Sequence, residues 1–165
     1  MRMTRSTMRL PAVLASLLPL LIGGPAYADS NSIEGLWNLV DVILDACPTG
    51  NPVRTVVDLK MFLHDGSMIE TSGSPGVGQP PVKRGVPGLG SWRHVSENHY
   101  AANFRFFRYD GTDDMFLGTQ TASVDIELSK DGNSLTTSTT VEIFDASGKP
   151  MGLPRCTTGT GTRVE

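Results

Sequence analysis

The segment Ser32-Ile-Glu-Gly-Leu-Trp-Asn-Leu-Val-Asp-Val-Ile-Leu-Asp-Ala-Cys-Pro48 decides the fold expected for this chain. It begins with a Gly-x-Trp motif, Gly35 and Trp37, and continues as a run of β-branched and other apolar residues. It ends on Cys47, one of only two cysteines in the sequence. Runs of this composition favour a β-strand. We expect this segment to be the first strand of an all-β domain.

The residues before this segment have the composition of an export signal. Residues 1–9 carry three arginines and no acid, residues 10–22 are apolar, and Ala26-Tyr27-Ala28 supplies the small residues that a signal peptidase recognises. The apolar run is shorter than a membrane span of roughly 20 residues and is interrupted by two prolines. We predict a signal peptide over 1–28 and a single exported domain over 29–165, periplasmic or extracellular, with no membrane span after cleavage.

The net charge of the mature chain limits the classes of partner that it can bind. Removal of the signal takes three of the 14 basic residues and none of the 17 acidic ones, which leaves a net charge of −6. An acidic excess disfavours nucleic acid and anionic membrane surfaces. We expect neither as a partner, and we expect a monomer.

The two cysteines, Cys47 and Cys156, form an even pair in a chain predicted to be exported. Such a pair favours a disulfide over two free thiols. Closing a loop of roughly 100 residues would stabilise the fold by about 4–5 kcal/mol on the loop-entropy account. We expect this bond to matter in so small a domain.

Alternating apolar and polar residues after the first segment predict further strands. They are separated by turns rich in Gly, Asn, Asp, Ser and Pro, and no segment of the mature chain favours a helix. The pattern predicts an eight-stranded antiparallel meander, in which the first strand is followed by strands at about Val53–His64, Ser67–Thr71, Leu89–Val95, Tyr100–Tyr109, Phe116–Leu128, Ser134–Asp145 and Arg155–Val164.

The segment Gly73–Gly90 interrupts this pattern. Its many glycines and prolines exclude a helix or a central strand. A loop of this length in a compact domain is often a lid or a binding loop, and a plain surface excursion is the alternative.

The numbering of the first and last strands favours closure of the meander into a barrel. In an antiparallel pair of strands, the residue numbers of facing partners add up to a nearly constant sum. The sum for Trp37 and Arg163 differs by only three from the sum for Cys47 and Cys156. A β-bulge would absorb that difference. The same pairing would place the Arg163 guanidinium on the indole of Trp37. Closure removes both sheet edges and leaves room for one small ligand.

Gly35-x-Trp37 in the first strand, with Arg163 at the end of the last, resembles the arrangement of lipocalins and other calycins. The chain also resembles a group of exported bacterial barrel proteins of unassigned function over nearly all of its mature length. The matching segments are Cys47-Pro-Thr-Gly50, Gly88-Leu-Gly-Ser-Trp92, and Cys156 with Gly161-Thr-Arg163. The resemblance implies a lipocalin-like up-and-down barrel and an export route, and it brings no catalytic motif.

Loops of a meander alternate between the two ends of the barrel. Trp37 and Arg163 would close one end, so we expect the mouth at the other, where the loops are Cys47–Pro52, Gly73–Gly90, Asp110–Met115 and Asp145–Pro150. All three histidines would then lie at the closed end, which argues against histidine catalysis in the pocket.

Two clusters could hold a metal ion. His94 and His99 flank one turn that also carries Glu97, and the acidic loop Asp110–Asp114 could hold calcium. A surface histidine pair and a solvated hairpin loop are the simpler interpretations. We therefore expect no metal and no cofactor.

The period of two along the strands predicts which side chains face the interior. Four apolar faces make the predicted lumen, with threonine hydroxyls on one wall. The alternative is that side chains fill the barrel completely. The expected ligand-binding residues are Val57, Leu59, Met61, Tyr100, Phe104, Phe106, Arg108, Val124, Thr137, Thr139 and Val141.

Basic residues near the mouth could hold the polar head of a ligand. Arg108 continues the inward parity of its strand, while Lys83 and Arg84 lie on the long loop. A carboxylate or phosphate would suit them. Alternatively, Arg108 forms a salt bridge with Asp45 or Asp110 at the rim.

Three functions follow from these expectations. The leading one is a non-catalytic secreted barrel that binds a small hydrophobic or amphipathic molecule, since no nucleophile or phosphate-loop motif is present. The second is a calycin-like or cyclase-like enzyme acting on a small apolar substrate, with Asp41 as the pocket acid and Tyr100 or Tyr109 steering the ligand. The third is a structural or interaction module of the cell envelope that uses an exposed patch at Phe62 and Phe144.

Overall fold

The computed structural model describes residues 32–72 and 82–164, in which every regular element is a β-strand. The predicted signal peptide and residues 73–81 of the long loop lie outside the described residues. The strands are β1 (Gly35–Leu44), β2 (Pro52–Phe62), β3 (Ser67–Ser72), β4 (Val82–Arg84), β5 (Gly88–Ser96), β6 (His99–Asp110), β7 (Phe116–Leu128), β8 (Ser134–Phe144) and β9 (Arg155–Arg163).

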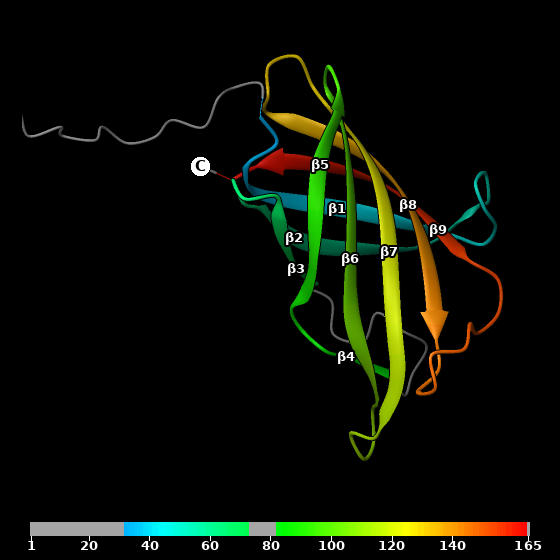
Figure 1. Cartoon of the computed structure of the whole chain (residues 1–165). Helices are drawn as coiled ribbons and strands as arrows, with labels where there is room; N and C mark the ends of the chain where they lie inside the picture. Colours follow the sequence, from blue (N-terminus) through cyan, green and yellow to red (C-terminus); the bar gives the residue numbers. More distant parts are fainter. Residues whose placement is uncertain (1–31, 73–81, 165) are drawn as a thin grey trace, which may run out of the picture.

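Eight of these strands close into an antiparallel β-barrel, as predicted. The order around the barrel is β6, β5, β3, β2, β1, β9, β8 and β7, and β7 pairs back to β6. The short strand β4, in the long loop, pairs with the mouth end of β6 beyond the reach of β5. Figure 1 shows β5, β6 and β7 in front, crossing β1, β2 and β9 behind them.

The pairing of β1 with β9 confirms the predicted closure. Trp37 lies opposite Arg163, and one unbroken register continues to Ile43 opposite Thr157. The expected bulge is absent from this ladder, because it ends before Cys47. The disulfide joins Cys47 to Cys156 across a sequence separation of 109, with Cα atoms 5.2 Å apart.

Trp37 and Arg163 seal one end of the barrel, also as predicted. The guanidinium carbon of Arg163 lies 4.4 Å from the centre of the Trp37 ring, and the indole Nε1 donates a 2.7 Å hydrogen bond to the carbonyl oxygen of Ile33. The Arg163 side chain also donates to the carbonyl oxygens of Ser32 and Glu34. This end is therefore closed by packed aromatic and aliphatic groups and by a satisfied cation.

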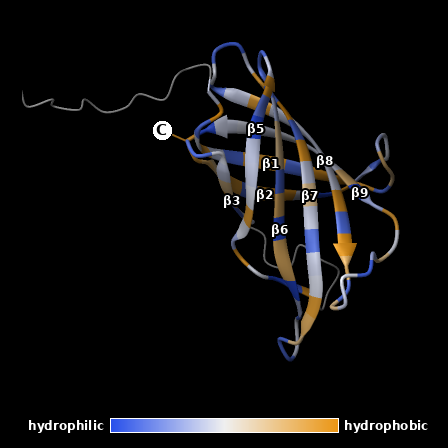
Figure 2. Cartoon of the chain, in the orientation of Figure 1, coloured by the Kyte–Doolittle hydropathy of each residue, from blue (hydrophilic) through white to orange (hydrophobic). Residues whose placement is uncertain are grey.

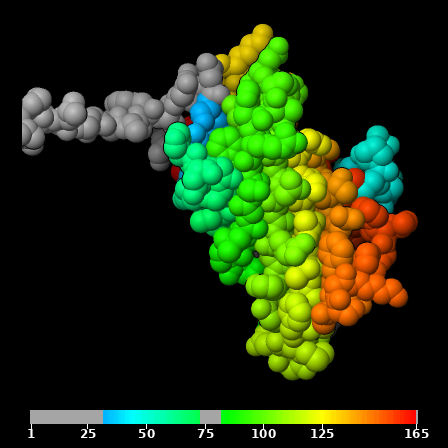
Figure 3. Space-filling view, in the orientation of Figure 1, coloured from blue at the N-terminus to red at the C-terminus, as the bar shows by residue number. Residues whose placement is uncertain are grey.

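Above this plug, the inner face of the barrel is packed over about half of its length. Figure 2 shows hydrophobic and hydrophilic bands interspersed along the strands in front, and β5, β6 and β7 lie side by side across the viewed surface (Figure 3). The buried core cluster includes Ile33, Trp37, Leu39, Phe62, Met68, Tyr100, Ala102, Val124, Ile126, Leu128 and Leu135.

The predicted inner face of β2 is wrong. Val57, Leu59 and Met61 are 45%, 41% and 37% exposed on the outside of the barrel, while Asp58 and Lys60 are buried inside it. Residues directly opposite in an antiparallel pair point to the same side of the sheet. Lys60 lies opposite the buried Trp37, and Asp58 lies opposite the buried Leu39. The alternate residues of β2 that are polar therefore face the interior of the barrel.

The outer apolar face of β2 continues onto its neighbours. Met61 lies opposite Ile69 on β3, which lies opposite Leu89 on β5, and both of these are exposed. The predicted exposed patch at Phe62 and Phe144 is wrong, because Phe62 is only 2% exposed and belongs to the core. In the described part of the chain, no helix exists that could cross a membrane.

Candidate functional site

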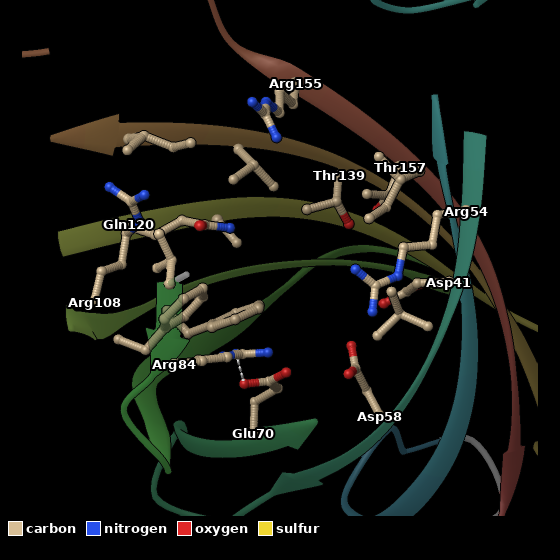
Figure 4. Close-up of a pocket in the computed structure, with 18 of the residues that line it drawn as sticks. Asp41, Arg54, Asp58, Glu70, Arg84, Arg108, Gln120, Thr139, Arg155 and Thr157 are labelled. Atoms are coloured by element: carbon tan, nitrogen blue, oxygen red, sulfur yellow. Dashed lines mark hydrogen bonds and ion pairs between the residues drawn. The ribbon is translucent and has the colours of Figure 1, made fainter. Parts of the chain in front are cut away.

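A cavity of about 520 Å³ occupies the half of the barrel opposite the Trp37 plug (Figure 4). It lies on the side of the loops that were predicted to form the mouth. The barrel is therefore neither wholly hollow nor wholly filled. The cavity is lined by Asp41, Ile43, Val53, Arg54, Val56, Asp58, Lys60, Glu70, Val82, Arg84, Phe104, Phe106, Arg108, Gln120, Ala122, Thr139, Val141, Ile143, Arg155 and Thr157.

Five of the eleven predicted ligand-binding residues line this cavity: Phe104, Phe106, Arg108, Thr139 and Val141. Three others are buried but do not line it: Tyr100 and Val124, which belong to the packed core, and Thr137, which bonds to Asp41. The remaining three are the outward-facing residues of β2 described above.

The inner end of the cavity is built from buried charges on β1 and β2. The Lys60 ammonium lies 2.9 Å from a carboxylate oxygen of Asp41 and 3.3 Å from one of Asp58. The Thr137 hydroxyl, on β8, donates a 3.3 Å hydrogen bond to the other Asp41 oxygen. Burying single charges is costly, and mutual pairing offsets much of that cost.

A second ion pair joins β3 to the short strand β4. The Arg84 guanidinium binds the carboxylate of Glu70, which is fully buried. The same guanidinium lies 3.6 Å from the centre of the Phe106 ring, a cation–π contact. β4 therefore brings a cation into the barrel to meet a buried acid.

Two glycines make room for these acids. A Cβ at Gly159 of β9 would lie 1.9 Å from the Asp41 carboxylate and 2.6 Å from the Thr137 hydroxyl. A Cβ at Gly88 of β5 would lie 2.8 Å from a Glu70 oxygen. Neither position could carry a larger side chain without displacing a charged group.

Burial changes the acid strength of these carboxyls. It raises the pKa of Glu70 to about 7, although the Arg84 charge acts in the opposite direction. Burial also raises the pKa of Asp41, against the influence of Lys60. For Lys60, burial favours the neutral form, but the surrounding carboxylates outweigh it and the pKa is raised. The ammonium therefore stays charged at neutral pH.

The mouth carries a different arrangement, two cavity-lining arginines from separate strands. Arg108 on β6 and Arg155 on β9 both line the cavity, and neither forms an ion pair within the described residues. Burial lowers the pKa of Arg108, and the positive charge of Arg155 lowers it further. The Gln120 amide lies on the same side of the cavity (Figure 4).

The alternative role of Arg108, a rim salt bridge with Asp45 or Asp110, is not found. The Asp45 carboxylate accepts a 2.7 Å hydrogen bond from the backbone amide of Asn51, and Asp110 accepts one of 2.7 Å from the amide of Thr112. The two cations of the long loop that could hold the head of a ligand form ion pairs within the protein, Arg84 with Glu70 and Lys83 with Asp114.

The other side chains considered for chemistry lie away from the cavity. His64 contacts Glu34 and His94 donates to the carbonyl oxygen of Glu97, both at the closed end. Tyr100 packs against the rings of Trp92 and His94.

The remaining groups that were suggested for chemistry lie on the outer face of the barrel and in a loop at its mouth. Tyr109 lies on the opposite parity of β6 from Arg108, among the rings of Phe107 and Phe116. In the acidic loop, the Asp113 carboxylate accepts a hydrogen bond from the Met115 amide, and Asp114 pairs with Lys83. Of the groups suggested for an enzyme, only Asp41 lies in the cavity.

Sequence reasoning missed Glu70, Asp58, Lys60 and Arg155. The signal for the two residues of β2 was the pairing of β1 with β2. Once the inward side of Trp37 is fixed, the constant register of that hairpin turns Asp58 and Lys60 inward. Glu70 follows in turn, because it lies opposite Lys60.

A sequence comparison finds no family model and no curated protein that matches this chain.

Proposed function

We propose that this protein is a non-catalytic carrier that binds a small amphipathic molecule inside its barrel, with the anionic head of the ligand held between Arg108 and Arg155. The observation that carries the proposal is the pair of cavity-lining arginines, neither of which has an acidic partner in the described part of the chain. Partial burial of Arg108 and the positive charge of Arg155, which is exposed at the rim, both disfavour the charged form of Arg108. An anion bound between the two arginines would offset this repulsion.

The chemistry of the two arginines selects the head group. A guanidinium presents donors in a planar fork that matches a carboxylate or phosphate. The Gln120 amide, beside them, offers further hydrogen bonds. Charge-assisted hydrogen bonds of this type contribute about 1.5–3 kcal/mol each.

The wall next to these arginines suits an aliphatic tail. Phe106, Ala122, Val141 and Ile143 line the cavity between its mouth and its inner end. Burying an aliphatic chain there would contribute about 0.8 kcal/mol per methylene group. An anionic head and an apolar tail together define a fatty-acid-like ligand.

Membership of an exported, lipocalin-like family forms part of the same proposal. The Trp37–Arg163 contact and the Cys47–Cys156 disulfide support it, because the first is an arrangement typical of such barrels and the second suits an oxidising compartment.

Isothermal titration with dodecanoate tests the proposal. We expect saturable binding at one site, weakened at least tenfold in Arg108→Gln and in Arg155→Gln. Arg105→Gln is the matched control, because Arg105 lies on the outer face of the same strand, bonded to Thr121. Absence of saturable binding in the wild type, or equal weakening in the control, would overturn the proposal.

An enzyme is the second candidate, and the buried Glu70, with its pKa of about 7, favours it. Such a carboxyl exchanges protons readily at neutral pH. Mass spectrometry of the probe recovered after long incubation separates the two functions. An unchanged probe supports the carrier, whereas a rearranged or cleaved probe whose formation is abolished in Glu70→Gln supports the enzyme.

A further inference from the structure

We propose that the inner end of the cavity is a second polar subsite, which binds a hydroxyl group at the far end of the ligand whose anionic head lies at Arg108 and Arg155. The ligand class is then a hydroxylated aliphatic acid rather than a simple fatty acid. This inference rests on the proposed function and makes it more specific.

Three buried polar atoms carry this inference, because none of them has a hydrogen-bond partner within residues 32–72 and 82–164. They are Oδ1 of Asp58, Oε1 of Glu70 and Nε of Arg84, and all three residues line the cavity. Asp58 is 6% exposed and Glu70 fully buried. Leaving a buried polar atom without a hydrogen bond is costly, so three such atoms in residues that line one cavity require an explanation.

The unpartnered atoms match the hydrogen-bonding capacity of a hydroxyl group. With Glu70 protonated, which its burial favours, the free oxygen of Glu70 carries an O–H group, so the set offers one acceptor on Asp58 and two donors, on Glu70 and Arg84. A hydroxyl group donates one hydrogen bond and accepts up to two. An apolar chain end would leave all three unsatisfied.

The charges at this end favour a neutral group over a second ion. Asp41, Asp58 and Glu70 face the cations Lys60 and Arg84, and Arg54 also lines the cavity. Three acids and three cations leave a net charge of zero with Glu70 ionised and of one with Glu70 protonated. A neutral donor therefore fits without disturbing the balance.

The two polar ends are separated by an apolar wall. Figure 4 shows Arg108 and Arg155 on one side of the cavity and Asp58 and Glu70 on the other. Glu70 lies beside Phe104, since both would contact a Cβ at Gly88, and Arg108 lies four residues further along β6. That distance is about 13 Å along a strand.

A length series of paired probes tests the inference. Acids from octanoate to hexadecanoate are titrated with and without an ω-hydroxyl group against the purified wild-type protein. At the best-fitting length, we expect the hydroxylated acid to bind about tenfold more tightly than its parent, as one additional charge-assisted hydrogen bond implies.

Two variants locate the preference. In Asp58→Asn, Lys60 holds the amide oxygen and turns the NH₂ group to the position of Oδ1, so an acceptor becomes a donor. In Glu70→Gln, Arg84 holds the amide oxygen and the NH₂ group takes the place of the O–H, so a donor is kept. Asp58→Asn should reduce the tenfold preference to less than threefold, whereas Glu70→Gln should keep it. Arg108→Gln should weaken both acids and leave the preference intact.

The outcomes separate this inference from the proposed function. Binding of both acids with equal affinity at every length overturns the hydroxyl subsite and leaves the carrier in place, with ordered water as the partner of the three atoms. Binding of neither acid overturns both. The comparison of the two acids in the wild-type protein tests the inference even if a variant fails to fold.

Discussion

At the scale of single residues, Lys60 determines the character of the cavity. Its ammonium is the cation that Asp41 and Asp58 share, and its side chain is 3% exposed. Lys60→Met would leave two carboxylates buried without it. Removing one partner of a buried ionic group costs about 3–5 kcal/mol. Urea unfolding at neutral pH should show a loss of this size.

The matched control for this substitution is Lys130→Met, in an exposed turn at the closed end. We expect it to change the free energy of unfolding by about 0.5 kcal/mol or less. If Lys60→Met changes the free energy of unfolding by as little as the control does, the buried ionic cluster is not as described.

Glu70 makes a separate prediction about pH. Its folded pKa of about 7 lies above the value of 4.5 expected when unfolded, so the folded state holds the proton more tightly. Its contribution to stability is therefore present below pH 4.5 and is lost as the pH rises to about 7. Chemical unfolding across this range should show stability falling with pH, with a flatter profile in Glu70→Gln.

The Glu70→Gln profile also contains its own control. Groups elsewhere in the chain contribute equally to both proteins, so only the difference between the two profiles reports on Glu70. A difference that stays constant from pH 4.5 to 7 would show that the carboxyl ionises normally.

Residue placement was predictable where two constraints agreed. Trp37 and Arg163 could be placed because the register of the terminal strands and the Gly-x-Trp motif gave the same answer. The side of the barrel that Met61 faces could not be predicted, because hydropathy was the only guide to it. The side chains that face inward beside it are charged, and their pairing partners are distant in sequence.

At the scale of elements, β9 fits against β1 because it carries glycines on its inner face. Gly159→Ala would drive a methyl group into the Asp41 carboxylate and the Thr137 hydroxyl. Overpacking of this kind costs about 1–3 kcal/mol. Thermal or urea unfolding should show this loss, together with a smaller cavity and weaker probe binding.

Thr158→Ala is the control on the same strand, because Thr158 is exposed on the outer face. We expect little change in stability from it. Equal effects at Gly159 and Thr158 would contradict the close contact between β1 and β9.

The eight barrel strands were predictable from alternation and turn residues. The short strand β4 was not, because three residues within a glycine- and proline-rich segment carry no periodic signal. Its formation depends on tertiary contacts, namely pairing with the end of β6 and the ion pair of Arg84 with Glu70.

At the scale of the whole molecule, the disulfide ties the first strand to the last. It closes a loop of 109 residues, for which the loop-entropy account gives about 4–5 kcal/mol. The Cys47→Ala/Cys156→Ala double variant should lose stability of this order in urea. Cys47→Ala alone in reducing buffer should match the double variant, and a loss below about 1 kcal/mol would show that strand pairing alone closes the barrel.

The barrel divides into a packed half and a hollow half. The packed half follows from the aromatic and aliphatic residues around Trp37, which sequence patterns identify well. The hollow half depends on glycines, on inward charges and on two arginines from different strands, none of which a single strand reveals.

A crystal structure of the protein grown with dodecanoate tests the account most directly. We predict the carboxylate between Arg108 and Arg155, with the tail running inward past Phe106 and Val141. An empty or collapsed lumen, with dodecanoate instead on the outer apolar face around Met61, would contradict it.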